Sequence, residues 1–143
     1  MQTVSDIMTI YPITVSPDTP LAVVWLMMDG EGVRQLPVVD GDGLIGIITE
    51  RDMRTILRTE LFELGSAEMV MTENPITVSP ITPAYRAAEM LHAYKFGALP
   101  VVDDGVLVGI VSVSDFLEQS AAEMPEATTG GVVSGVGVGF GEI

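Results

Sequence analysis

Two short motifs in this chain place a hydroxyl three residues before a carboxylate. They are Thr49-x-x-Asp52 and Ser112-x-x-Asp115, and each falls where a predicted strand passes into a predicted helix. A carboxylate at a helix start can accept hydrogen bonds from both hydroxyls of a sugar diol. The earlier hydroxyl, together with the free N–H groups of the helix start, can face a phosphate. The same spacing also forms a capping box, which needs no ligand, so both interpretations stay open.

Basic residues are distributed unequally around the two motifs. Arg51 and Arg54 flank Asp52, and Arg34 precedes the apolar run that begins at Leu36. The corresponding positions near the second motif carry Ser114, Leu117 and Gly97. Because two or three nearby cations determine whether an anion binds, we expect the two sites to differ in affinity for a phosphorylated ligand.

Both motifs recur because the second half of the chain repeats the first. One constant shift, without a gap, superposes residues 71–80 on residues 8–17 and residues 99–103 on residues 36–40. Both copies read Met-Thr-x-x-Pro-Ile-Thr-Val-Ser-Pro and Leu-Pro-Val-Val-Asp. Repetition of one small unit predicts two copies related by a pseudo-twofold axis, with clefts between them.

Each repeat is predicted to fold as β-α-β-β-α, which makes the chain an α/β (α+β) protein. Proline after Thr19 and Thr82 predicts a helix start with that threonine as N-cap. Acid–glycine pairs predict the hairpin turns. Expected strands cover residues 13–15, 35–39 and 44–49, then 76–78, 98–102 and 106–112; expected helices cover about 20–30 and 83–94 and begin near 50 and 114. We assign residues 1–60 to repeat 1, residues 61–123 to repeat 2 and residues 124–143 to a glycine-rich tail.

The first helices of the two repeats differ in their pattern. In the second repeat Ala84, Ala87 and Leu91 form one apolar stripe, as in an ordinary amphipathic helix. Residues 21–28 are apolar on every side. We therefore expect a homodimer through the Trp25–Met28 region; the alternative is that the closing helix of the same chain covers this face.

The bulk composition narrows the classes of partner. A net charge of −14 and a pI near 4.1 argue against DNA or RNA. Hydrophobic residues make up 48% of the chain, yet the longest apolar run is far shorter than the roughly 18 residues of a membrane span. The first residues lack the pattern of a secretory signal, and the absence of cysteine leaves no disulfide framework, so we expect a cytoplasmic protein.

Little in the chain points to an enzyme. One histidine and no cysteine exclude the usual zinc-binding sets, and we expect neither a metal nor a required cofactor. No Walker loop, nucleophile elbow or H-E-x-x-H motif occurs. The alternation of glycine with apolar residues over 130–141 has neither the strand nor the helix that a dinucleotide-binding loop needs. We interpret it as a flexible terminus or as an arm that packs on a partner chain.

Taken together, the repeated motifs resemble a known family. Residues 6–52, with Ile-Met-Thr, Pro-Ile-Thr-Val, Leu-Pro-Val-Val-Asp and Gly-Ile-Ile-Thr-Glu-Arg-Asp in order, are similar to a cystathionine-β-synthase (CBS) domain. Their recurrence in the second half of the chain resembles the tandem pair called a Bateman module. The resemblance implies clefts that bind adenosine ligands and a regulatory role. No catalytic domain is attached in this sequence, so we expect a stand-alone pair with a separate effector protein, as yet unknown.

The resemblance also implies roles for particular residues. Asp52 and Asp115 would bind ribose, with Thr49, Ser112, Arg51 and Arg34 near the sugar or phosphate. Adenine would lie against Ile13, Thr14, Leu36 and Pro37 in one cleft and Ile76, Thr77, Leu99 and Pro100 in the other. The expected function is sensing of AMP, ADP or ATP and allosteric signalling to a partner protein. The alternative is a degenerate pair that acts as a dimerisation scaffold with empty clefts.

Overall fold

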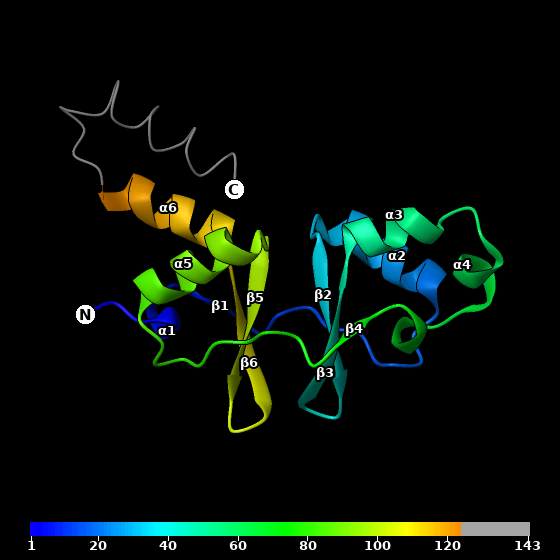
Figure 1. The fold of residues 1–143 in the computed structure, drawn as a ribbon, viewed down its shortest axis with the longest axis horizontal. Coiled ribbons are helices and arrows are strands. Elements are labelled where there is room, and N and C mark those ends of the chain that lie inside the picture. Colours follow the sequence, from blue (N-terminus) through cyan, green and yellow to red (C-terminus); the bar gives the residue numbers. More distant parts are fainter. Residues whose placement is uncertain (124–143) are drawn as a thin grey trace.

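The fold consists of two similar halves that lie side by side, each built on an antiparallel hairpin with helices packed at one end (Figure 1). A computed structural model describes residues 1–123; the predicted glycine-rich tail lies outside the described residues. Strand β2 (Gln35–Asp40) pairs with β3 (Gly43–Thr49), and β5 (Ala98–Asp103) pairs with β6 (Val106–Ser112). These bounds lie within about a residue of those predicted, and the mixed α/β fold class is confirmed.

The two hairpins share one register. Gln35 lies opposite Thr49 in the first half, and Ala98 lies opposite Ser112 at the corresponding positions of the second. Both ladders shift register at the same place, between two consecutive valines. The sequence repeat therefore becomes a geometric repeat, and a single pairing of Gly43 with Val106 joins the hairpins into one sheet.

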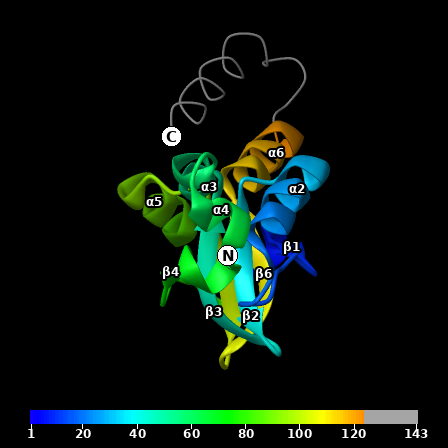
Figure 2. The same ribbon diagram turned by 90° about the vertical axis from the view of Figure 1, so that its right-hand side faces the viewer.

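Helices gather at the end of the sheet away from the hairpin turns, as the view along the long axis shows (Figure 2). The predicted helices are present as α2 and α5, and the closing helices as α3 and α6. Three short helical elements were not predicted, because each is too short to show a helical period. The bounds are α1 (Val4–Ile7), α2 (Leu21–Glu31), α3 (Glu50–Ile56), α4 (Glu60–Leu64), the 3₁₀ helix η1 (Ala67–Met69), α5 (Ala84–Tyr94) and α6 (Val113–Glu123).

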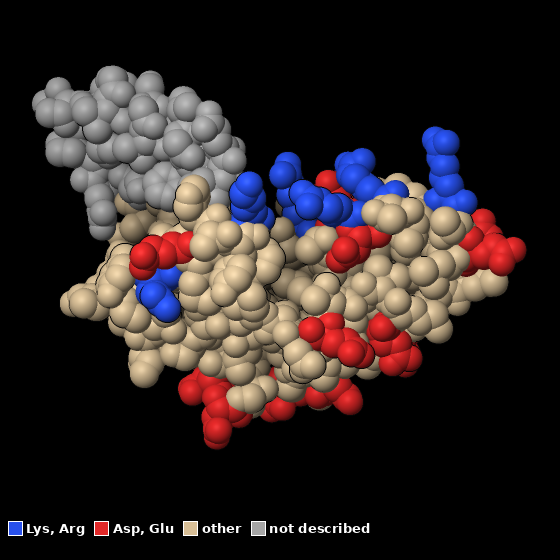
Figure 3. All heavy atoms as spheres, viewed as in Figure 1, with Lys and Arg blue, Asp and Glu red and all other residues tan. Residues whose placement is uncertain are grey.

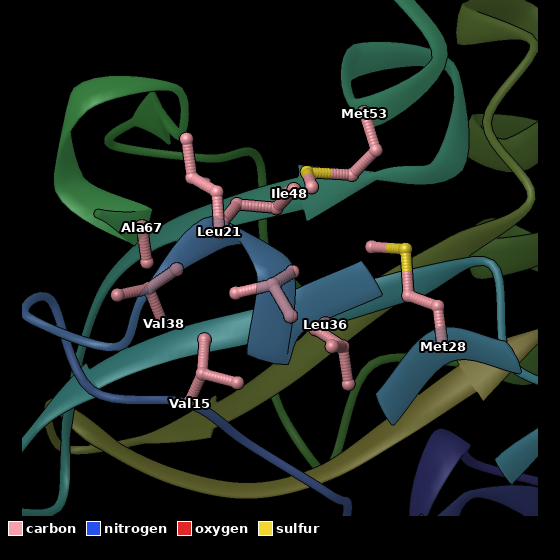
Figure 4. Packing of buried hydrophobic residues seen from close by; sticks show 9 residues of the cluster. Val15, Leu21, Met28, Leu36, Val38, Ile48, Met53 and Ala67 are labelled. Atoms are coloured by element: carbon pink, nitrogen blue, oxygen red, sulfur yellow. The ribbon is translucent and has the colours of Figure 1, made fainter. Parts of the chain in front are cut away.

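Each half has its own apolar core. In the first half, side chains of α2, β2 and β3 meet those of α3 and η1 (Figure 4). Leu21, Leu36 and Ile48 are fully buried there, and burial of each such side chain contributes about 1.5–3 kcal/mol. The second core is formed by the equivalent residues of α5, β5 and β6. These cores hold the strand-to-helix junctions in place.

Each core also contains a buried side chain from a segment that belongs, by sequence, to the other repeat. Val4 of α1 is fully buried in the second core, and Ala67 of η1 is fully buried in the first. The strands that follow these residues cross in the same way: β1 (Thr9–Ile10) pairs with β6, and β4 (Thr72–Glu73) pairs with β3. Unfolding of either half therefore exposes apolar surface on both repeats.

A glycine in each long strand permits this crossing. A Cβ atom on Gly46 would overlap Met71 Sδ and lie 3.0 Å from the Thr72 carbonyl oxygen. A Cβ on Gly109 would lie 2.8 Å from Met8 Sδ and 2.9 Å from the carbonyl oxygen of the following threonine. Methionine and glycine therefore recur in both repeats because the crossing strand lies directly on β3 or β6.

Two local predictions were wrong. Residues 13–15 and 76–78 form no regular strands; each contributes one parallel bridge, Val15 with Val38 and Val78 with Val101. Prolines on both sides of each segment lack the N–H that a longer ladder needs. Thr19 is not the N-cap either. Pro20 occupies the N-cap position of α2, and Pro83 occupies that of α5. The Thr19 hydroxyl instead accepts a hydrogen bond from Ser16 N at 3.0 Å, and Thr82 does the same in the second repeat.

The outer face of α2 remains apolar and exposed. Helices α3 and α4 of the same chain pack against α2, yet Val23 is 41% exposed and Leu26 is 68% exposed. The equivalent positions on α5 carry Arg86 and Glu89. Within residues 1–123, no helix combines the length and the apolar character needed to cross a membrane.

Candidate functional site

The first strand-to-helix junction, here called the Asp52 end, comprises Thr49, Arg51, Asp52 and the start of α3. Thr49 N donates to Asp52 Oδ2 at 2.9 Å, and Asp52 N donates to Thr49 Oγ1 at 3.2 Å, which forms a complete capping box. Among the described residues, no group donates to Asp52 Oδ1. The capping interpretation is thus correct, and it leaves one carboxylate oxygen available.

The second junction, the Asp115 end, comprises Ser112, Ser114, Asp115 and the start of α6. Ser112 N donates to Asp115 Oδ2 at 2.8 Å, and Asp115 N donates to Ser112 Oγ at 3.3 Å. Here the other carboxylate oxygen is contacted as well, because Thr9 Oγ1 donates to Asp115 Oδ1 at 3.4 Å. That distance is longer than the usual range for an O–H donor, so the contact is weak and a better-placed hydroxyl could displace it.

Thr9 of repeat 1 contacts the Asp115 end, and β4 of repeat 2 pairs with β3, the strand that leads into the Asp52 end. The chain runs from Thr9, which is paired with β6, to Val15, which is paired with β2. Residues 11–14 therefore cross between the halves. Residues 74–77 make the equivalent crossing from β3 to β5. The strand that leads into each end is therefore paired with a segment of the other repeat.

The structure places the predicted adenine-contacting residues in two environments. Ile13 and Ile76, on the crossing segments, are 36% and 37% exposed, with Thr14 partly buried and Thr77 exposed beside them. The residues on the strands are buried: Leu36, Pro37, Leu99 and Pro100. Hydrogen bonds from Val15 N to Pro37 O and from Val78 N to Pro100 O hold the two groups together. Among the residues predicted to contact adenine, the two isoleucines are thus the apolar side chains that a flat ring could reach.

The predicted cations lie on the surface near the Asp52 end. Arg51 is exposed and Arg34 is exposed, and Glu50 N donates to the Arg34 carbonyl oxygen at 2.8 Å, which holds the backbone of Arg34 beside the start of α3. Lysine and arginine side chains gather along the helix-bearing edge with some acidic side chains among them, and further acidic residues lie near the hairpin turns (Figure 3). On a chain of net charge −14, most of the basic side chains visible in this view therefore lie on the edge that carries the helices.

Sequence reasoning missed two features of these ends. The Thr9 hydroxyl contacts Asp115, although its repetition as Thr72 could have drawn attention to it. Gln35 lies over Gly97, where a Cβ would come within 2.5 Å of Gln35 Nε2, so the two repeats meet here. In the part of the chain that the structure describes, no three His, Cys, Asp or Glu side chains are grouped so that they could hold a metal ion.

Comparison with known proteins identifies relatives of this chain. A model of the CBS domain family matches it twice, over residues 4–59 and residues 67–122. A CBS domain-containing protein of Dictyostelium discoideum is 36% identical over 118 residues, which cover 73% of this chain and 81% of that protein. Inosine-5′-monophosphate dehydrogenase of Thermoplasma acidophilum is 32% identical over 128 residues, but this chain spans only 25% of that enzyme's length.

Solved structures agree with this pattern. CBSX2 in complex with AMP matches with a TM-score of 0.78 and 30% identity, over 85% of this chain and 98% of that chain; CBSX2 is a CBS-pair protein of Arabidopsis thaliana. The CBS domain pair of protein MJ0100, in complex with 5′-methylthioadenosine and S-adenosyl-L-methionine, matches with a TM-score of 0.77 and 28% identity, over 87% of this chain and 99% of that chain.

Proposed function

The chain belongs to the CBS domain family, as its sequence resemblance predicted, and we propose that it is a regulatory module that binds an adenine nucleotide, AMP, ADP or ATP, between its two repeats. The observation that carries the proposal is the free carboxylate oxygen of Asp52 at the end of a strand, β3, that pairs with β4 of the other repeat. The likeness to a CBS pair whose structure contains AMP, and of which this chain covers 98%, supports it.

Ribose binding is assigned to the two aspartates. Asp52 Oδ1 is free to accept from a ribose hydroxyl while Oδ2 continues to cap α3. Asp115 Oδ1 can do the same once the ribose replaces the long contact from Thr9. Thr49 and Ser112 fix the orientation of these carboxylates and lie next to the sugar. Since each aspartate keeps its capping bonds, binding requires no local refolding.

The adenine and the phosphate are assigned to the neighbouring segments. The base would lie on Ile13 and Thr14 at one end and on Ile76 and Thr77 at the other, against the strands that carry the buried prolines. Arg51 and Arg34 would bind the phosphate, because a guanidinium forms bidentate hydrogen bonds with phosphate oxygens.

Signalling would follow because a ligand at either end would contact both repeats. A ligand that contacts a carboxylate of one repeat and a crossing segment of the other favours one relative arrangement of the two halves. It can shift that equilibrium only by its difference in affinity for the two arrangements. A separate effector protein would recognise the arrangement that the ligand favours.

Thermal unfolding in the presence of candidate ligands tests the proposal. The panel consists of AMP, ADP, ATP, S-adenosylmethionine and NADH at millimolar concentration. A ligand at a hundred times its dissociation constant adds about 2.7 kcal/mol, which at this chain length raises Tm by roughly 5–10 °C. We expect a rise with an adenine nucleotide that disappears in Asp52→Ala or in Asp115→Ala.

A matched control separates ribose binding from capping. Asp6 completes a third capping box, in which Thr3 N donates to Asp6 Oδ2 at 2.8 Å, but it lies at neither end. Asp6→Ala should therefore lower the basal Tm as the other two substitutions do, yet keep the ligand-induced rise. Flat melts across the panel would contradict nucleotide sensing and favour the scaffold alternative, in which the capping boxes are purely structural.

We also propose that the module forms a homodimer through the Trp25–Met28 region of α2, although Met28 itself is buried in the first core. The exposed Val23 and Leu26 supply an apolar face on the first half, whereas the equivalent Arg86 and Glu89 make α5 polar. Two copies would therefore meet through their first halves. Leu26→Glu should convert the dimer to a monomer in light scattering, whereas Glu89→Gln should not. A monomeric wild-type protein would contradict this interface.

A further inference from the structure

Strand β1 ends in two consecutive apolar side chains that the rest of the described chain leaves exposed. Ile10 is 57% exposed, and Tyr11, the residue after it, is 89% exposed. Neither side chain belongs to either apolar core. Within residues 1–123, the Tyr11 side chain makes no hydrogen bond and no ring contact. These two residues are here called the Ile10–Tyr11 pair.

The fold does not require these side chains, because the second repeat builds the same position without them. In β4, Glu73 holds the place that Ile10 holds in β1, with the same pairing to a glycine of the long strand. Asn74 follows at φ +49°, nearly the +51° of Tyr11. A polar pair therefore occupies the equivalent backbone within the same chain.

The apolar pair is unfavourable for the isolated chain. A bulky side chain in the left-handed region is strained, and the exposed tyrosine gains no packing that offsets this strain. Ile10 in turn leaves apolar surface in contact with water. Strained backbone of this kind concentrates at binding sites, and tyrosine is among the residues that dominate the energy of protein–protein contacts. The pair thus has the character of a protein-binding contact.

The surface beside the pair is acidic. Ile10 lies opposite Gly109, which is three residues along β6 from the hairpin turn, or about 10 Å. The two hairpins pair with each other at their turns, and residues 35–46 and 99–110 contain no lysine or arginine. The turns carry four exposed aspartates: Asp40, Asp42, Asp103 and Asp104. None of them forms an ion pair within the described residues. At about one Debye length, their negative charge acts on whatever covers the pair.

We propose that the Ile10–Tyr11 pair is the docking point for a segment of a partner protein that carries apolar side chains flanked by lysine or arginine. The apolar side chains would cover the pair, and the cations would face the aspartates of the turns. The pair leads directly into Ile13 and Thr14, which the proposed function assigns to the adenine, so this partner would be the effector. That identification rests on the proposed function, whereas docking itself needs no nucleotide.

Selection of random peptides displayed on phage, on the immobilised full chain without nucleotide, tests the docking point. We expect the enriched peptides to combine net positive charge with aromatic or branched aliphatic residues. Their affinity, measured by fluorescence polarisation, should fall about 30-fold or more in Tyr11→Asn, as for loss of a dominant contact residue. Asparagine is already present at the equivalent position, so this variant keeps the fold. Tyr85→Asn is the matched control, because Tyr85 on α5 is 61% exposed, and it should leave the affinity unchanged.

The charge assignment is tested with the same peptides. Their affinity should fall as salt is raised, and Asp42→Asn combined with Asp103→Asn should weaken binding several-fold. Failure to enrich any peptide, enrichment of acidic peptides, or equal affinity for the wild type and Tyr11→Asn would overturn the proposal. Loss of binding in Leu26→Glu instead of Tyr11→Asn would assign the peptides to α2 and overturn it as well.

Two further measurements separate this inference from other interpretations. If Tyr11→Asn abolishes self-association in light scattering, the pair is a contact between copies of this chain and the proposed partner is wrong. Peptide docking together with flat nucleotide melts would support the docking point and contradict the proposed function. Nucleotide-induced stabilisation without peptide docking would have the opposite meaning.

Discussion

Replacement of Gly46 by alanine tests the packing that completes each half. Gly46 is buried in β3 between β2 and β4. An added Cβ would overlap Met71 Sδ, lie 2.8 Å from Met71 Cγ and lie 3.0 Å from the Thr72 carbonyl oxygen. The methionine can change its rotamer, but the carbonyl belongs to the backbone of β4. The crossing strand must therefore move away from β3.

The magnitude follows from two opposing effects. Overpacking of a tightly filled site destabilises by about 1–3 kcal/mol. Replacement of glycine by alanine also restricts the unfolded chain, and this offsets about 0.4–1 kcal/mol of that destabilisation. We expect Gly46→Ala to lower the free energy of unfolding by up to about 2.5 kcal/mol, which at this length corresponds to a fall in Tm of up to roughly 10 °C.

Gly43→Ala is the matched control in the same strand. Its Cβ would lie 3.6 Å from Asp40 O and 3.8 Å from Gly105 O, which are ordinary contacts. Urea unfolding followed by circular dichroism should therefore place this variant within about 0.5 kcal/mol of the wild type. The penalty of Gly46→Ala should also shrink in a Met71→Ala background, because the nearest contact has been removed.

Two results would refute the reasoning. If Gly46→Ala is no more destabilising than Gly43→Ala, β4 does not lie on β3 as the structure has it. If the penalty is the same with and without the Met71 side chain, the methionine contact is not its cause.

Three further predictions concern stability. Val4→Ala should lower the free energy of unfolding by about 1–3 kcal/mol, since Val4 is fully buried in the second core; unchanged urea unfolding would mean that α1 does not pack there. Tyr11→Asn should raise the free energy of unfolding by about 0.5–1 kcal/mol. Tyr11 is 89% exposed at φ +51°, and the equivalent Asn74 adopts φ +49°, a backbone conformation that suits asparagine better than tyrosine. A lower Tm would show that the tyrosine ring makes stabilising contacts. Gly97→Ala should change Tm by only a degree or two, because the group in its way is the mobile end of Gln35; a large loss would indicate a fixed Gln35.

Local patterns in the sequence predicted most of the regular structure. The hairpins were predicted from acid–glycine turns between apolar runs, and the observed strands match. The Thr49–Asp52 and Ser112–Asp115 pairs were predicted as capping boxes or ligand contacts, and the capping bonds are present. Such features join residues a few positions apart, so their geometry is nearly complete once the local backbone forms.

Where sequence prediction failed, a competing local hydrogen bond or a proline intervened. Thr19 has the residue type and position of an N-cap, but its hydroxyl closes the preceding Ser16 turn instead. Residues 13–15 have strand-like composition, but one bridge to Val38 is all that the flanking prolines allow.

The sequence alone determined that there are two equivalent units, because identical motifs that recur in the same order and at the same spacing must form the same local structure. It did not determine that Val4 completes the second core, or that Thr9 reaches Asp115, far along the chain. Those contacts depend on which strand edge each terminal segment pairs with. That choice follows from burial of apolar surface in the assembled fold, which no local pattern encodes.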